Sequence, residues 1–305
     1  DIVERAFKEW SQKGVCEVSG KFSWIDCQQL VQESLVRDGE VLIKHIRNAD
    51  NKFGYAIQFL EPDYLDEEYN IPAKNGNRVV MGVELNQYNK PIAYHLHSGT
   101  THPYDSAGQI GHRVRVPAAD IMHIYKPERC QQTRGVPLFA SVMNQIHQLN
   151  GYTEAELVAA RLSASKSMFM KTQDGVGYSG DDFDQDAPIM DVEPGSITQL
   201  PPGVDIVTPN MDHPNSGYEG FHKAMLRTIA SGLGLDYVTL SSNLESVSYS
   251  SIRAGTIESR DNYKMHQRFL IEHFANPIFR EWLNLGMTAG AIPFPVDRYN
   301  KFADS

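Results

Sequence analysis

The sequence predicts a mixed α+β protein, and three features of its patterning support that class. Apolar residues recur at helical spacing between residues 218 and 233, and Gly232 and Gly234 end this pattern. A longer stripe with the same spacing runs from Leu138 to about Lys166. Short segments between residues 40 and 125 are rich in β-branched and aromatic residues and are bounded by turn formers, as strands are. The stripe of the first of these helices consists of Tyr218, Phe221, Met225, Leu226, Ile229 and Leu233.

The N-terminal part predicts two amphipathic helices, over residues 1–12 and 24–37, with Ser23 as the N-cap of the second. The β-rich part follows. Within it, residues 82–97 predict a hairpin whose turn spans Asn86 to Lys90. The expected strands lie within residues 39–48, 55–62, 78–86, 91–97 and 120–127.

A long helix is expected next. Pro137 suits its first position, because proline lacks an N–H and an N–H there would have no partner within the helix. Thirty residues of helix would be about 45 Å long. The second half of the segment is rich in Ala and Ser, which lets neighbouring helices approach closely. The segment therefore predicts either a helix packed against copies of itself or an ordinary core helix.

Residues 167–215 lie between the two helical patterns and are dominated by Gly, Asp and Pro. Short strands are expected around Met168–Lys171 and Ser196–Leu200. Residues 240–251 read LSSNLESVSYSS, with six serines and one carboxylate, and predict a loop. A last long helix is expected from about Tyr249 to Trp282.

The formal net charge is −10, from 28 basic and 38 acidic residues. A protein that holds DNA tightly normally presents a basic face. The acidic balance therefore argues against a tight DNA clamp and suits a surface along which phosphates slide, or it serves only solubility.

The chain has three cysteines, Cys16, Cys27 and Cys130. This small, odd number argues against a disulfide framework and favours a reducing compartment. No apolar run is long enough to span a membrane. The sequence starts at Asp1 without a methionine and stops at Ser305 without a terminating motif, so we expect a core fragment of a longer protein.

An acidic segment has a spacing close to that of a calcium loop. Asp182, Asp184 and Asp186 alternate, and Glu193 occupies the twelfth position. Ala187 stands where such a loop needs glycine for its turn. The segment therefore predicts a solvated acidic loop.

Histidines at period two form the other candidate metal site. His95 and His97 share one face of an expected strand, and His102 and His112 follow. Such a pair can ligate zinc when a third ligand converges on it. Without a Cys or Glu in register, they predict surface histidines and no metal site.

Motifs of catalysis are missing from the sequence. It has no G-x-x-x-x-G-K-[ST] phosphate loop and no G-x-S-x-G elbow, and its clustered serines have no histidine placed as a base. We therefore expect no catalytic residue and no cofactor.

The last long helix carries a basic stripe within about a 90° sector. Such a stripe either lines a DNA path or meets carboxylates of a neighbouring subunit, and the overall acidity favours the subunit interface. Its residues are Arg253, Arg260, Lys264 and Arg268.

Several long motifs of the sequence belong together. Residues 217–254 carry the string GY–F–LR–IA–GLG–Y–LS–N–SYSS–RA. The other motifs are TRGVPLFASVMNQIHQL at 133–149, VEPGSITQLPPGVDI at 192–206 and VPAADIMHIYKPERCQQTRG at 116–135. Together they closely resemble the portal proteins of tailed bacteriophages, specifically the lambda-like family. The resemblance covers roughly residues 5–285, in the family's order.

The resemblance implies a portal fold with a β-rich wing, two stem helices and a small clip inserted between them, the N-terminal and C-terminal (crown) parts being absent. Its implied boundaries are 1–136 for the wing, 137–166 for the first stem helix, 167–215 for the clip, 216–234 for the second stem helix, and 235–305 for a channel loop, a long helix and the return to the wing.

The resemblance also implies a function: a closed ring of identical subunits, a dodecamer in the family, at one capsid vertex, through which double-stranded DNA enters and leaves. The implied partners are the large terminase, the head–tail connector and the capsid protein. The location is the virion, assembled in the bacterial cytoplasm. Another ring-forming connector of the virion and a metal-dependent hydrolase remain the alternatives.

Two further groups of residues take a role from the resemblance. The residues expected to face the DNA channel are Lys223, Arg227, Ser231, Ser241, Ser242, Asn243, Ser246 and Ser248. Those expected to dock partners on the clip are Asp181, Asp182, Asp184 and Asp186.

Overall fold

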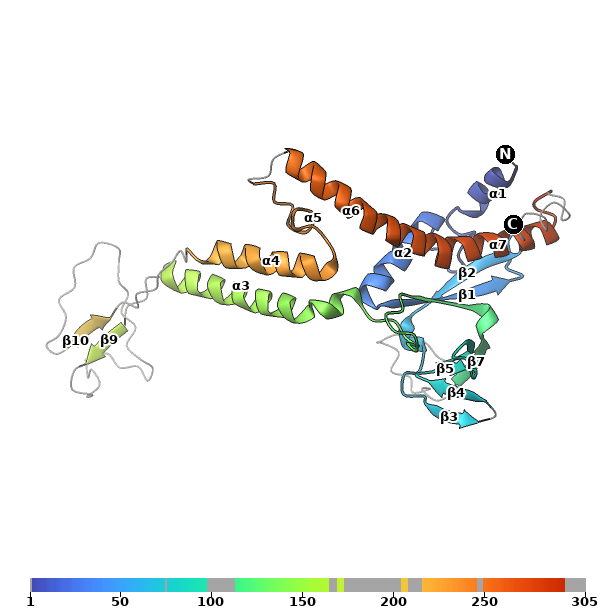
Figure 1. Ribbon diagram of the computed structural model, residues 1–305, viewed down its shortest axis with the longest axis horizontal. Helices are drawn as coiled ribbons and strands as arrows, with labels where there is room; N and C mark the ends of the chain where they lie inside the picture. The colour runs from blue at the N-terminus through green and yellow to red at the C-terminus, as the bar shows by residue number, and fades with distance from the viewer. Residues whose placement is uncertain are drawn as a thin grey trace, which may run out of the picture. The chain divides into compact units, whose positions relative to one another are not determined.

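A computed structural model of the chain describes residues 2–74, 76–97, 113–164, 169–172, 204–207, 216–245 and 249–293 (Figure 1). The chain divides into two compact units. Unit 1 joins Asp1–Val142 to Gly232–Ser305, and unit 2 is Met143–Ser231. Helices and antiparallel sheets both occur, so the expected α+β class is confirmed.

Two antiparallel sheets form the β-rich part of unit 1. The three-stranded sheet has the order β2-β1-β8, and the five-stranded sheet has the order β3-β4-β5-β6-β7. The strands of the first are β1 (Glu40–Arg47), β2 (Tyr55–Leu60) and β8 (Ile121–Tyr125). Those of the second are β3 (Ile71–Lys74), β4 (Asn77–Val80), β5 (Val83–Leu85), β6 (Pro91–His97) and β7 (Arg113–Pro117). Short 3₁₀ turns lie at η1 (Pro62–Tyr64) and η2 (Ala118–Asp120).

Strand β1 is buried on both of its faces. Because successive side chains point to opposite faces, Val41 and Ile43 enter one apolar core while Leu42 enters another. The first core also contains residues of the helices α1, α2 and α7. The second contains residues of the five-stranded sheet. The three-stranded sheet is therefore a middle layer between helices and a second sheet.

Helices α1 (Ile2–Trp10) and α2 (Trp24–Arg37) confirm the two amphipathic helices expected near the N-terminus. Ser23 caps α2 as expected: its hydroxyl accepts a hydrogen bond from the Asp26 amide, and the Asp26 carboxylate accepts one from the Ser23 amide at 2.8 Å. Trp10 stacks on Tyr55, and its indole donates to the Tyr55 carbonyl at 2.9 Å.

The 82–97 hairpin is confirmed, with the Asn86 amide donating to the Lys90 carbonyl across its turn at 3.0 Å. The strand expected over 78–86 is instead two strands. Met81 and Gly82 have φ values of 49° and 80°, which turn the chain back between β4 and β5. Strands β3 and β7 were not expected from the sequence.

The helix expected to start at Pro137 starts later. Pro137 has ψ 138°, an extended conformation, and precedes the 3₁₀ turn η3 (Leu138–Ser141). Val142 then interrupts the helical hydrogen bonding before α3 (Met143–Ala164) begins.

In unit 2, helix α3 lies beside α4 (Tyr218–Leu233) (Figure 1). Tyr152 joins them through its ring, stacked on Tyr218 at 5.7 Å and edge-on to Phe221 at 4.7 Å. The strands β9 (Phe169–Thr172) and β10 (Val204–Val207) pair antiparallel. Strand β9 fits the expected strand near 168–171, whereas residues 196–200 lie outside the described residues.

The loop expected over 240–251 is wrong at both ends, because α5 (Tyr237–Ser241) and α6 (Tyr249–Leu270) extend into it. Of the described residues in this serine-rich segment, 242–245 lie outside helices. The expected last helix therefore starts where predicted, but it does not end at Trp282. A π-helical turn, η4 (Ile271–Ala275), joins α6 to α7 (Asn276–Thr288). The described helices include none that is both long and apolar enough to span a lipid bilayer.

We expect Gly232→Ala to lower the free energy of unfolding by roughly 1–3 kcal/mol. A Cβ at Gly232 would lie 2.3 Å from Cγ1 of the buried Val142, whose β-branched side chain has little freedom to move aside. The measurement is urea unfolding.

The matched control for this substitution is Gly220→Ala in the same helix, where an added Cβ meets nothing within 4 Å. There alanine should stabilise the protein by about 0.5–1 kcal/mol because it favours the helix. Equal effects at the two glycines would contradict the tight contact at Val142.

Candidate functional site

The four cations of the α6 stripe are all exposed. Lys264 pairs with the exposed Asp261 at 3.0 Å, a contact of little energetic weight. Arg253, Arg260 and Arg268 make no ion pair with any residue that the structure describes. The stripe is thus available to a partner, and its assignment to a subunit interface stays a prediction.

The channel candidates on α4 have partners or lie on the surface. Lys223 forms an ion pair with Glu219 one turn before it, which also lowers the pKa of Glu219. Arg227 and Ser231 are exposed on the same helix. None of these positions shows a ligand site, so their place in a channel stays a prediction.

The candidates in the serine-rich segment satisfy much of their own hydrogen bonding. The Ser241 hydroxyl donates to the Tyr237 carbonyl at 2.7 Å and accepts from the Asn243 amide at 3.2 Å. Ser242 is exposed and adopts a left-handed φ of 53°, which ends α5. The side-chain oxygen of Asn243 accepts from the Glu245 amide at 2.8 Å. These are turn-forming contacts.

The residue before α5 is hydrogen-bonded to α6. Ser259, buried on α6, donates its hydroxyl to the carboxylate of Asp236, the residue before α5. Ser246 and Ser248 lie outside the described residues, as do all four clip aspartates, Asp181, Asp182, Asp184 and Asp186.

Each histidine of the pair on β6 lies near a carboxylate, and each of these carboxylates also binds an arginine. His95 contacts Glu84 at 3.3 Å, and Arg115 shares that carboxylate. His97 lies 3.9 Å from Asp66, which also binds Arg113. Within the described part of the chain, no group of three His, Cys, Asp or Glu residues is placed to hold a metal ion.

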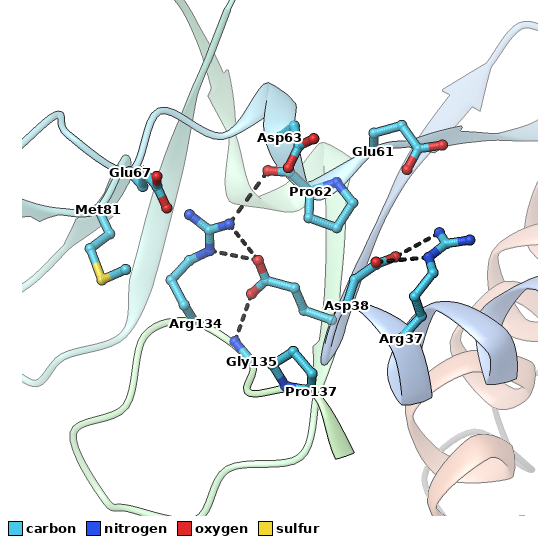
Figure 2. A pocket seen from close by; sticks show the side chains of 11 residues that line it. Arg37, Asp38, Glu61, Pro62, Asp63, Glu67, Met81, Arg134, Gly135 and Pro137 are labelled. Carbon is cyan, nitrogen blue, oxygen red and sulfur yellow. Dashed lines mark hydrogen bonds and ion pairs between the residues drawn. The ribbon is translucent and has the colours of Figure 1, made fainter. Parts of the chain in front are cut away.

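An acidic pocket in unit 1 was not anticipated from the sequence (Figure 2). It has a volume of about 390 Å³. Its walls come from the end of α2, the turn η1, the β4–β5 connection and the segment that leads to η3. The lining residues are Arg37, Asp38, Glu40, Glu61, Pro62, Asp63, Glu67, Met81, Arg134, Gly135 and Pro137.

Glu40 is the buried anion of this pocket. Its carboxylate accepts hydrogen bonds from Arg134 Nε at 2.7 Å, from the Gly135 amide at 2.6 Å and from His123 Nε2 at 2.9 Å. Burial raises the pKa of Glu40, but these donors outweigh burial and hold the pKa at about 2. One nitrogen of Arg134, Nη1, is buried without a partner among the described residues.

Two glycines let the backbone reach Glu40. A Cβ on Gly135 would lie 2.1 Å from the Gly39 carbonyl oxygen, and a Cβ on Gly39 would lie 2.2 Å from the carbonyl carbon of Val136. Gly39 also has a φ of 83°. Only glycine at both positions allows this approach, so the segment 134–136 is held against the start of β1.

Comparison with known proteins decides the family. A family model described as the lambda family of phage portal proteins matches residues 1–267. The chain belongs to that family. It is similar to a probable portal protein of Halomonas phage phiHAP-1, at 36% identity over 98% of this chain and 59% of the relative. It is also similar to portal protein B of Escherichia phage lambda, at 23% identity over 96% of this chain and 60% of the relative.

This member of the portal family therefore spans about three fifths of the length of these relatives. Among solved structures, it is similar to a chain from the neck of a native GTA particle computed with C12 symmetry. That chain is 13% identical with a TM-score of 0.47, and the match covers 82% of this chain and 69% of the other.

We expect Glu40→Gln to destabilise the protein by about 3 kcal/mol at pH 7, because it removes the anion from a buried network of donors. The pKa of Glu40 in the folded protein is lower than the ordinary glutamate pKa of 4.5, so the stabilisation is present above pH 4.5 and is lost as the pH falls toward 2. The difference between wild type and variant should shrink over this interval in unfolding measurements.

Glu61→Gln, at an exposed carboxylate of the same pocket, is the control and should leave stability unchanged. A Glu40→Gln variant as stable as the wild type, or a difference that stays constant to pH 2, would contradict the charged state of Glu40.

Proposed function

We propose that the chain is a subunit of a portal: a closed ring at one vertex of the virion, through which double-stranded DNA is packaged and ejected. The observation that carries the proposal is the match of the portal family over residues 1–267. A closed cyclic ring needs the same pair of surfaces on every subunit, and its symmetry axis leaves a central hole. We expect the dodecamer implied by the family.

The domain organisation is proposed on the same basis. Unit 1 corresponds to the wing, from residues 1–136 and from the return of the chain over 235–305. Unit 2 corresponds to the stem helices, within 137–166 and 216–234, with the clip at 167–215 between them. The support is that α3 and α4 pack through aromatic rings and that a short antiparallel sheet, β9–β10, lies between them in the sequence.

The channel lining is proposed for the serine-rich segment and for Lys223, Arg227 and Ser231 of α4. DNA that moves through a ring must not be held, because each firm Lys or Arg contact with a phosphate adds salt-sensitive affinity. No basic residue occurs between Arg227 and Arg253. Ser242 is exposed, and the hydroxyl and amide groups around it bond chiefly to their own turn.

The proposed role is structural and non-enzymatic, with no cofactor. Energy for DNA movement would come from a separate ATPase, the large terminase, docked on the clip during packaging. The head–tail connector would dock on the clip after packaging, with the clip aspartates as contacts, and the capsid protein would surround the ring. Membership of the portal family favours this role over another virion connector. His95 and His97, on which the hydrolase alternative partly rests, lie against the carboxylates of Glu84 and Asp66, which also bind arginines.

We expect Ser242→Arg combined with Ser246→Arg to leave ring assembly intact and to slow or stall packaging. Two guanidinium groups in every subunit would bind passing phosphates and hold the duplex. The measurement is the amount of DNA in proheads that carry the variant, at low and high salt.

The control is Gln29→Arg with Gln87→Arg, which adds the same charge at exposed positions away from this segment. It should fill proheads normally. Normal filling of the Ser242/Ser246 variant at low salt, where phosphate attraction is strongest, would show that the segment does not face the duplex.

A further inference from the structure

One face of α6 mixes cations with exposed apolar side chains. Ile257 and Ile271 are 54% and 52% exposed. At 100° per residue, Ile257 falls within the sector of the four basic residues, and so does Ile271, the first residue of the turn η4 that continues α6. The buried Ser259, which bonds to Asp236, lies on the side of the helix turned away from this sector. A face that met only phosphates would need cations but no isoleucines, so its composition favours a protein partner.

The acidic pocket has the complementary composition. Glu61, Asp63 and Glu67 are exposed on its walls, and the ion pairs between described residues include none of these three carboxylates (Figure 2). Apolar side chains adjoin them. Pro62, Met81 and Pro137 line the pocket, and Val136, Leu138 and Phe139, which flank Pro137 in the sequence, are exposed.

We infer that the basic–apolar face of α6 docks on the acidic–apolar surface around this pocket in a neighbouring copy of the chain. The inference rests on the proposed ring, in which one surface of each subunit meets a different surface of the next. Charge and apolar character match at both ends of the contact: guanidinium and ammonium groups face carboxylates, and isoleucines face Val136, Leu138 and Phe139.

The net charge of the chain also favours a contact between basic and acidic surfaces of neighbouring copies. Copies that each carry a net charge of −10 repel one another when they are brought together. A contact that places four cations against the acidic pocket offsets this repulsion locally and fixes the register of the two subunits. It also explains why an acidic protein concentrates unpaired arginines on one exposed helix face.

The test is charge reversal on each side of the contact and on both together. The α6 variant carries Arg260→Glu and Lys264→Glu, the pocket variant carries Glu61→Lys and Asp63→Lys, and the combined variant carries all four. Sedimentation velocity over a range of protein concentrations measures self-association. Each one-sided variant should need at least about tenfold more protein to associate, and the combined variant should recover most of the loss.

A matched control is Asp50→Lys with Glu128→Lys, which changes the charge equally at exposed positions outside the pocket. This pair should not restore association to the α6 variant. Unfolding curves of all variants check that the exposed substitutions leave the fold intact. In addition, carbodiimide treatment of mixed ¹⁴N and ¹⁵N protein should join Lys264 of one copy to Glu61, Asp63 or Glu67 of another.

The outcomes separate this inference from the proposed function. If wild-type rings form but the combined variant recovers nothing, the pocket is not the acceptor. If the α6 variant associates normally while DNA filling of proheads changes, the stripe faces DNA. Either result overturns the inference and leaves the portal role standing. Wild-type protein that does not self-associate at any concentration overturns both.

Discussion

The buried carboxylate of Glu40 is the interaction on which the rest of unit 1 depends. It sits at the start of β1, the strand whose two faces enter the two apolar cores. Its donors come from β8 and from the segment that leads into η3. An anion buried this deeply is tolerated only when donors surround it, so the carboxylate and its donors fix these elements together.

In both units, long helices keep apolar side chains on their surfaces. Met143 and Leu157 of α3 and Met265 of α6 are exposed. Exposed apolar residues scattered singly need no explanation, but several on long helices indicate surfaces that other chains cover. On α6 they lie near arginines that form no ion pair with a described residue. The portal assignment gives those surfaces a use, because neighbouring subunits in a ring would cover them.

Local signals in the sequence predicted much of this fold. The Ser23 cap, the Asn86–Lys90 turn and Gly234 after α4 each act within a few residues, so the sequence alone reveals them. The Met81–Gly82 turn was missed because a methionine with positive φ is uncommon. The π-helical turn η4 was missed because it keeps a nearly helical spacing of apolar residues.

The Glu40 network could not be predicted from the sequence at all. The donors lie 83 to 95 residues from Glu40 in the sequence and are brought to it only by strand pairing and by two close glycine contacts. The serine-rich segment was recognised by composition, but composition did not reveal that its hydroxyls bond to their own turn. The basic stripe was found by periodicity, whereas the exposure of the isoleucines beside it is seen only in the folded structure.

Assembly into a ring is the central claim, since the channel, the docking platform and the contact between α6 and the acidic pocket all presuppose it. Electron microscopy of the purified protein tests it most directly, in low-salt buffer where attraction between the basic stripe and the acidic pocket is least screened. The account predicts closed rings of uniform size with a central hole wide enough for a DNA duplex. Only monomers, or open filaments without closure, at every concentration would contradict it.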